Sequence, residues 1–340
     1  MFRPLPILFI HGFNGDPGDW TDGGFRQYLL EHGGLDPDLV RLFRYGVAED
    51  GTYNNRGDLR PIASRLAGVG LSDKDRLTCS VDQLSADSAA RGGPAQVTLI
   101  AHSLGGIISR YYLSRTTPDE FGTVYRGNVG RLITIASPHR GVDLARLTEL
   151  VPRGSLGWWF IRLLEKLGLA PALPAQAVEG WEATLNEAQL AERAQVAPEM
   201  LPDARVLLTD TPIYQQLAPD SPLLAELNQP GTLPASVDCH CFYGDILVRV
   251  AVRVAGLWLV DHTTSFGDLA VPAYSARVIP NVQSAPHPFV TQKSLEWTLR
   301  VAPSEDEARA LADYMPETQH GKLLSNPAVQ EGVLLSVLGG

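Results

Sequence analysis

The first 140 residues alternate between short apolar runs and longer segments in which apolar residues recur at helical spacing. An uninterrupted apolar run of about four to eight residues is typical of a strand that is buried on both faces. The predicted strands are Leu5–Ile10, Leu39–Tyr45, Val97–Ile100 and Arg131–Ala136. The predicted helices between them are Phe25–Glu31, Leu59–Leu66 and Val81–Ala90. Strands that alternate with helices indicate an α/β protein with a mostly parallel central sheet and helices on both faces.

This alternation breaks between residues 143 and 235. A strongly apolar segment of helical spacing there contains Trp158, Trp159 and Phe160, and several prolines interrupt the sequence that follows it. Paired tryptophans on a short amphipathic helix suit an apolar substrate, so we expect residues 143–235 to form a lid or cap insertion. In this interpretation Trp158, Trp159 and Phe160 bind substrate. The alternative is that they are ordinary core residues.

The remainder of the chain returns to shorter regular patterns. Val237–Tyr243 and Arg277–Val282 predict strands, and Val290–Arg300 predicts a terminal helix. The apolar segment Val248–Val260 predicts either a hairpin or a further wall of a pocket. The expected domains are a core of residues 1–142 and 236–300, the insertion 143–235, and a C-terminal extension 301–340 whose role the sequence does not assign.

The stretch 97–112 is the most informative, because a strand there leads directly into a helix. The sharp turn between them forces Ser103 into a strained backbone conformation, while the small residues Ala101 and Gly105 let strand and helix approach each other. Ser103 is thereby placed at a helix N-terminus, whose free N–H groups favour a nearby anion. We interpret the turn as a nucleophile elbow with Ser103 as the nucleophile. The alternative is a serine at an ordinary strand–helix junction.

Composition and charge limit the class of protein and the kinds of partner to be expected. The 340 residues are 44% hydrophobic and 19% charged, which fits a soluble globular chain. A formal net charge of -10 argues against nucleic acid as a partner and against electrostatic attachment to anionic lipid. No secretory leader and no apolar run long enough for a membrane span is visible, so we expect a cytoplasmic protein. The oligomeric state is not encoded in any pattern that we recognise.

Three cysteines are too few for a disulfide framework, but two of them flank a histidine as Cys239-His240-Cys241. In a strand, Cys239 and Cys241 share one face and His240 points to the other. No second pair of Cys or His residues completes a set of four ligands. We therefore expect buried thiols and no metal site.

A glycine-rich loop, His11-Gly12-Phe13-Asn14-Gly15, follows the first predicted strand. It lacks the glycine spacing of the phosphate-binding loops, which argues against a nucleotide site. A serine nucleophile that attacks an ester instead needs two backbone N–H groups to hold the negative carbonyl oxygen of the transition state. We expect one from Leu104, directly after the nucleophile, and the second from Phe13 in this loop.

Three segments together resemble the α/β-hydrolase superfamily. PILFIHGFNG, LIAHSLGG and ITIASPHRGVD are similar to bacterial lipases and, more narrowly, to the lipase-like group that includes inositol deacylases acting on lipid anchors. The resemblance covers residues 5–145 well and 205–300 more loosely. Ser137 departs from the threonine that the family usually carries there. The resemblance implies an α/β-hydrolase fold and a Ser-His-Asp triad in the chain order serine, acid, histidine.

The triad acid that the resemblance implies is Asp268. It lies in Gly267-Asp268-Leu269-Ala270-Val271-Pro272, which is similar to a family segment whose aspartate is the acid. A leucine replaces the glycine that usually follows, which changes the turn but keeps the carboxylate. Asp245, just after the preceding strand, is the alternative, and Asp261 is a weaker one.

The base that the resemblance implies is His287, in a loop after the predicted strand Arg277–Val282. His262 precedes Asp268, so it fits the order of the triad only if Asp245 is the acid. His320 lies in what we expect to be a polar tail beyond the last core helix.

These features predict a serine hydrolase of carboxylic esters, a lipase or esterase that needs no cofactor. Its substrate is expected to be a small-molecule or lipid ester, with transient contact to lipid surfaces and no nucleic-acid partner. The same triad would serve a thioesterase, an amidase or an acyltransferase. A non-catalytic binding protein of the same fold stays open, and a nucleotide-binding domain is a more distant alternative because its glycine fingerprint is missing.

Overall fold

A parallel sheet runs through the centre of the computed structural model, which describes residues 4–13, 15, 17–22, 24–45, 57–70, 79–142, 211–254, 257–265, 267–268, 270–298, 318 and 320–339. In spatial order its strands are β2 (Val40–Phe43), β1 (Ile7–Ile10), β3 (Val97–His102), β4 (Val129–Ile135), β5 (Asp238–Val254) and β7 (Ala285–Thr298). Every neighbouring pair in this order is parallel. The predicted mostly parallel sheet is confirmed.

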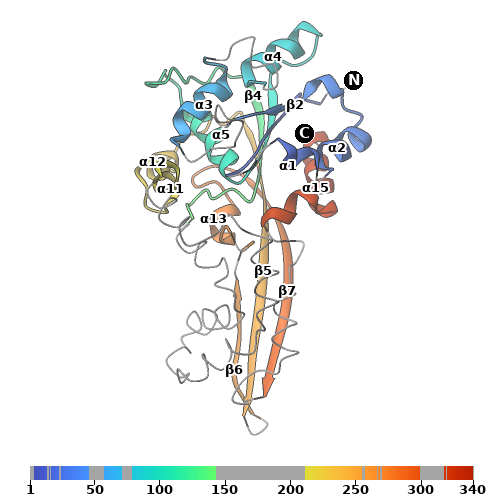
Figure 1. Cartoon of the computed structure of the whole chain (residues 1–340), viewed down its shortest axis with the longest axis vertical. Coiled ribbons are helices and arrows are strands. Elements are labelled where there is room, and N and C mark those ends of the chain that lie inside the picture. Colours follow the sequence, from blue (N-terminus) through green and yellow to red (C-terminus); the bar gives the residue numbers. More distant parts are fainter. Residues whose placement is uncertain are drawn as a thin grey trace, which may run out of the picture.

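A seventh strand, β6 (Leu257–Ser265), runs antiparallel to the second half of β5. It continues along the edge of β5 beyond the point where β4 ends, while β7 follows the opposite edge of β5 as far as Arg253. Strands β5, β6 and β7 therefore leave the sheet together as a long arm (Figure 1). Of the two interpretations of Val248–Val260, the hairpin is the one that the structure adopts.

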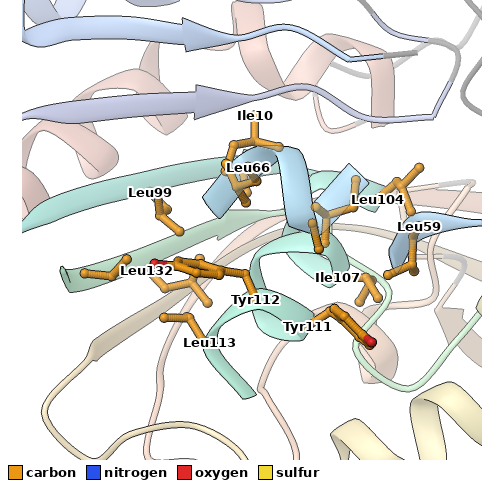
Figure 2. Close-up of a cluster of buried hydrophobic side chains, with 14 of the residues drawn as sticks. Ile10, Leu59, Leu66, Leu99, Leu104, Ile107, Tyr111, Tyr112, Leu113 and Leu132 are labelled. Carbon is orange, nitrogen blue, oxygen red and sulfur yellow. The ribbon is translucent and has the colours of Figure 1, made fainter. Parts of the chain in front are cut away.

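Helices cover both faces of the sheet, and the alternation of side chains in each strand explains why. In β1, Leu8 and Ile10 join one apolar cluster, whereas Ile7 and Phe9 join the other. The first cluster receives α3 (Leu59–Ala67), α4 (Val81–Ala90), α5 (Leu104–Ser114), α11 (Pro212–Leu217) and α12 (Pro222–Leu227). Figure 2 shows the part of this cluster in which α5 packs between α3 and the strands.

The second cluster receives α1 (Gly18–Thr21), α2 (Phe25–Gly33) and α15 (Pro327–Leu338). Helix α15 follows the short 3-10 helix η4 (His320–Ser325), and its Val329, Val333 and Val337 are buried against the sheet. The expectation of a polar tail around His320 is therefore wrong. Apolar residues four positions apart form one face of a helix, and here that face completes the core.

Two other local predictions are wrong. Residues 277–282 form turns after the short helix α13 (Ala273–Ala276), and no strand lies among them. Residues 290–298 belong to β7, not to a terminal helix. Fourteen consecutive backbone pairings between β5 and β7, from His240 to Arg253 on β5, override the local preference of this polar segment.

The other strands and helices predicted for the first 140 residues are confirmed with shifts of a few residues at their ends. Within the described ranges, no helix combines the length and apolarity needed to cross a bilayer. The predicted lid falls largely on residues 143–210, which lie outside the described residues, and so do Trp158, Trp159 and Phe160.

Candidate active site

Ser103 stands alone between β3 and α5, with a backbone φ of 52° and ψ of -121°. A positive φ is rare for a residue with a Cβ atom and is typical of strained functional turns. Two backbone hydrogen bonds hold the turn: the Ser103 N–H donates to Ile135 O at 2.8 Å, and Gly106 N donates to Ser103 O at 3.1 Å. The strained backbone that the sequence predicts for Ser103, between a strand and a helix, is confirmed.

Three glycines around the elbow have no space for a side chain. A Cβ atom on Gly105 would lie 2.6 Å from the carbonyl oxygens of Ile10 and His11, and one on Gly106 would collide with the side chain of Ser137. A Cβ atom on Gly12 would lie 2.9 Å from Ser103 Cβ. The first turn of α5 is thus packed directly against the end of β1 and the loop that follows it.

Asp268 lies in a tight loop after β6, buried and surrounded by donors. Its Oδ1 accepts hydrogen bonds from the N–H groups of Ala270 at 3.0 Å and Val271 at 2.6 Å. Its Oδ2 lies 2.8 Å from Nδ1 of His320. The carboxylate is 1% exposed, so almost all of its hydrogen-bonding capacity is directed at these three partners.

His320 is joined to the same loop through its backbone, because its N–H donates to Asp268 O at 3.0 Å. A Cβ atom on Gly244 of β5 would collide with Thr318 O and lie 3.2 Å from Asp268 Cβ. The missing side chain at Gly244 therefore lets the two segments pack together over β5. Two contacts with Asp268, one from the ring and one from the backbone, fix the orientation of the His320 imidazole.

The ring of His320 also lies against the ring of His102, with their centroids 4.7 Å apart. His102 directly precedes Ser103, so this contact brings His320 to the elbow. Burial first, and then the neighbouring His320 and His11, hold the pKa of His102 well below its usual value of 6.5. His102 is therefore neutral at physiological pH, which adds no positive charge beside His320.

The structure does not bring His287 to Asp268. His287 is part of β7 and pairs in register with Phe242 of β5, whose ring stacks on the imidazole at 4.2 Å. Its Nε2 lies 3.0 Å from Nδ1 of His240, and His240 in turn contacts Asp238. Burial and the adjacent His240 lower the pKa of His287.

The physical reason for this difference is the early start of β7. The sequence predicts that the strand ends before His287 and that a loop follows it. Because the strand begins at Ala285, His287 is fixed within the sheet. The imidazole that lies beside Asp268 is that of His320, a residue that the sequence analysis places in a polar tail. The apolar spacing of Val329, Val333 and Val337 is the signal that this segment returns to the core.

Asp245, the alternative acid, has a different set of partners. Its Oδ1 accepts a hydrogen bond from Ser265 Oγ at 2.6 Å and another from Gly267 N at 3.1 Å. Asp245 therefore holds the start of the loop that carries Asp268. Asp261 and His262 belong to β6, where they pair with Ala251 and Val250 of β5.

The loop after β4 is tied to the segment that follows Asp268. The Arg140 N–H donates to Ser275 Oγ at 3.0 Å, and that hydroxyl donates to Gly141 O at 2.7 Å. Arg110, fully buried in α5, donates to His139 O at 3.2 Å and to Leu227 O at 2.6 Å. These bonds lock the elbow helix, this loop and α12 into one rigid support.

The cysteines follow the alternation predicted for their strand. Cys239 and Cys241 are buried in the first apolar cluster, whereas His240 points to the other side and contacts His287. Burial raises the pKa of the Cys239 thiol to about 12. Among the described residues, no group of three or more His, Cys, Asp and Glu side chains has the geometry to hold a metal ion.

Residues 70–149 match the model of the PGAP1-like alpha/beta domain. The chain shows no significant similarity to a curated protein sequence. Among solved structures, lipase 1 from Pelosinus fermentans is 13% identical, with a TM-score of 0.44 over 98% of this chain and 99% of that one. The mature lipase BlEst2 from Bacillus licheniformis is 15% identical, with a TM-score of 0.39 over 99% and 92%.

The lipase from Staphylococcus hyicus is 12% identical, with a TM-score of 0.34 over 100% of this chain and 99% of that one. At these values the solved structures do not define the fold. The strand order and the strained serine between β3 and α5 are what define it. Residues 70–149, which contain β3, Ser103, α5 and β4, are the part of the chain that is similar to a PGAP1-like alpha/beta domain.

Proposed function

We propose that the protein is a serine hydrolase of carboxylic esters in which Ser103, His320 and Asp268 form the catalytic triad. The observation that carries the proposal is the 2.8 Å contact between His320 Nδ1 and Asp268 Oδ2, made by a ring that also lies against the residue before the strained Ser103. The acid is the one that the sequence predicts. The base is His320 in place of His287.

In this mechanism Asp268 accepts a hydrogen bond from His320 Nδ1–H, which leaves Nε2 as the basic atom. His320 takes the proton of the Ser103 hydroxyl as its oxygen attacks the ester carbonyl. The Leu104 and Phe13 N–H groups stabilise the oxyanion. His320 then gives its proton to the departing alcohol, and a water molecule, activated by the same imidazole, hydrolyses the acyl-enzyme.

Two features support this assignment of the base. Asp268 is buried, and an imidazolium next to it during the reaction is stabilised by a carboxylate that water screens little. The donors from Ala270 and Val271 occupy Oδ1, so Oδ2 is directed at His320. We infer a carboxylic ester as substrate from the resemblance of the sequence to bacterial lipases. The preferred acyl-chain length follows from the experiment below.

The test compares wild type with Ser103→Ala, His320→Asn and the matched control His287→Asn. Each protein is incubated with a fluorophosphonate probe and assayed on p-nitrophenyl esters of short to long chain. We expect labelling of wild type that Ser103→Ala abolishes, and a loss of kcat of about 10⁴-fold or more in His320→Asn. His287→Asn should keep kcat within a few-fold of wild type.

Two outcomes of this comparison would contradict the proposal. A folded wild type that neither reacts with the probe nor turns over any ester, with or without detergent, overturns the hydrolase and favours a binding protein. An active wild type in which His287→Asn is dead and His320→Asn is active overturns the assignment of the base.

A further inference from the structure

The peptide that joins Gly12 to Phe13 lies directly beside the nucleophile elbow. The Cα of Gly12 is so near the elbow that an added Cβ atom would lie 2.9 Å from Ser103 Cβ and 3.0 Å from His102 Nδ1. This peptide carries the Phe13 N–H, one of the two donors proposed for the oxyanion. Its orientation therefore decides whether that donor is available.

Several donors converge on the opposite end of this peptide, the carbonyl oxygen of Gly12. His11 Nδ1 lies 3.0 Å from it, the Tyr45 hydroxyl 3.2 Å and the N–H of Gly15 3.3 Å. The Tyr45 hydroxyl also lies 2.7 Å from His11 O, so one tyrosine contacts two successive carbonyls of the loop.

Tyr45 itself has little freedom to move. Its side chain is 1% exposed, and its ring stacks on the His11 ring with centroids 3.9 Å apart and planes only 3° from parallel. The ring also packs against Phe43 of β2 at 5.6 Å. The position of the hydroxyl is thus set by the stack on His11 and by the end of β2.

A trans peptide points its C=O and its N–H in opposite directions, and the described residues contain no cis bond. Donors that hold the Gly12 carbonyl on one side therefore hold the Phe13 N–H on the other. A flip of this peptide would take the Gly12 carbonyl away from His11 Nδ1, the Tyr45 hydroxyl and the Gly15 N–H together, and the loss of these hydrogen bonds opposes the flip. A donor that is oriented before the reaction stabilises the transition state at no cost of reorganisation.

We propose that Tyr45 is a positioning residue of the oxyanion hole. Its hydroxyl, together with His11 Nδ1, fixes the loop peptide so that the Phe13 N–H is held ready for the negative oxygen. Tyr45 lies on the β2 side of the sheet, outside the triad and the elbow. The inference rests on the proposed hydrolase function and extends it to the support of the second oxyanion donor.

The test is Tyr45→Phe, which removes the hydroxyl and keeps the stacked ring. Tyr112→Phe is the matched control, because Tyr112 is also fully buried and its hydroxyl bonds Asn128 Oδ1 at 2.5 Å, away from the elbow. We expect Tyr45→Phe to lower kcat for a p-nitrophenyl ester about tenfold or more with KM unchanged. The inhibition constant of an alkyl boronic acid, which mimics the tetrahedral intermediate, should rise by the same factor.

A second variant, His11→Phe, keeps the stack on Tyr45 and removes the other side-chain donor to Gly12 O. It should change kcat and boronate inhibition in the same direction. If both variants match Tyr112→Phe in kcat and in boronate inhibition, the positioning role is overturned while the hydrolase stands. If wild type itself is inactive and unlabelled, the proposed function fails and this inference fails with it.

Discussion

The strained backbone of Ser103 predicts that glycine at this position makes the protein more stable than alanine does. We compare Ser103→Ala with Ser103→Gly, two variants that lack the proposed nucleophile and differ only by the Cβ atom. At a φ of 52° that atom is strained, and glycine relieves the strain.

The expected magnitude follows from two opposing contributions. A residue held in a sparsely populated backbone region costs about 1–3 kcal/mol. Glycine loses more conformational entropy on folding than alanine, which costs about 0.5–1 kcal/mol. The glycine variant should therefore exceed the alanine variant in free energy of unfolding by about 0.5–2 kcal/mol. For a chain of 340 residues, this corresponds to a rise in Tm of about 1–3 °C.

Urea unfolding of both variants, followed by circular dichroism, measures the difference. Ala86→Gly is the control for the same chemical change at an ordinary position, because Ala86 is exposed within α4. There we expect a loss of about 1 kcal/mol. If Ser103→Gly is less stable than Ser103→Ala by a similar amount, the elbow stores no strain and the reasoning is refuted.

Three further predictions concern packing, pH and the loop that carries Asp268. Gly105→Ala places a Cβ atom 2.6 Å from two carbonyl oxygens, so it should abolish ester hydrolysis and lower the Tm. Gly57→Ala, with open space around it, should change neither, and equal behaviour of the two variants would contradict the packing described. His102 and His139 are buried, and the pKa of each lies well below 6.5. Burial and the nearby His320 lower the pKa of His102, whereas burial and Arg110 lower that of His139. Below pH 6.5 the unfolded chain therefore binds protons that the folded chain does not. The free energy of unfolding should therefore fall as pH drops below about 6.5, by up to about 1.4 kcal/mol per pH unit for each histidine, and denaturation of His139→Gln from pH 7 to 5 should show a smaller slope. Asp245→Asn weakens the hydrogen bonds to Ser265 and Gly267, at the beginning of the loop that carries Asp268, so kcat should fall about tenfold or more while fluorophosphonate labelling still occurs. An unchanged kcat would show that the conformation of this loop does not depend on Asp245.

The sequence predicts those parts of the structure that residues close together in the chain determine. The strand before Ser103, the helix after it and the loop at Gly12 are each specified within about ten residues, by apolar runs and by glycines that close approach requires. The acid loop is also local, because Gly267 and Val271 form its turn around Asp268.

The structure of β7 and the position of His320 depend on contacts with residues far away in the chain. Residues 290–298 form a strand because β5 offers an edge to pair with, and nothing in their own polar sequence requires it. The same pairing holds His287 within the sheet, and the imidazole beside Asp268 is that of His320, which lies 52 residues further along the chain. A contact of this separation leaves no periodic signal near either residue. Of these features, only the burial of α15 could be predicted locally, from the spacing of its apolar residues.

The return of the chain through α15 has a consequence for synthesis. Ser103 and Asp268 are translated well before His320. Arg131 on β4 holds the last turn of α15, because it donates to Ser336 O and to Val337 O, 3.0 Å away. A nascent chain that has folded through β7 therefore has a serine and a carboxylate but no imidazole between them. On the proposed assignment, such an intermediate is catalytically silent. Activity begins only when the segment after β7 has left the ribosome and docked.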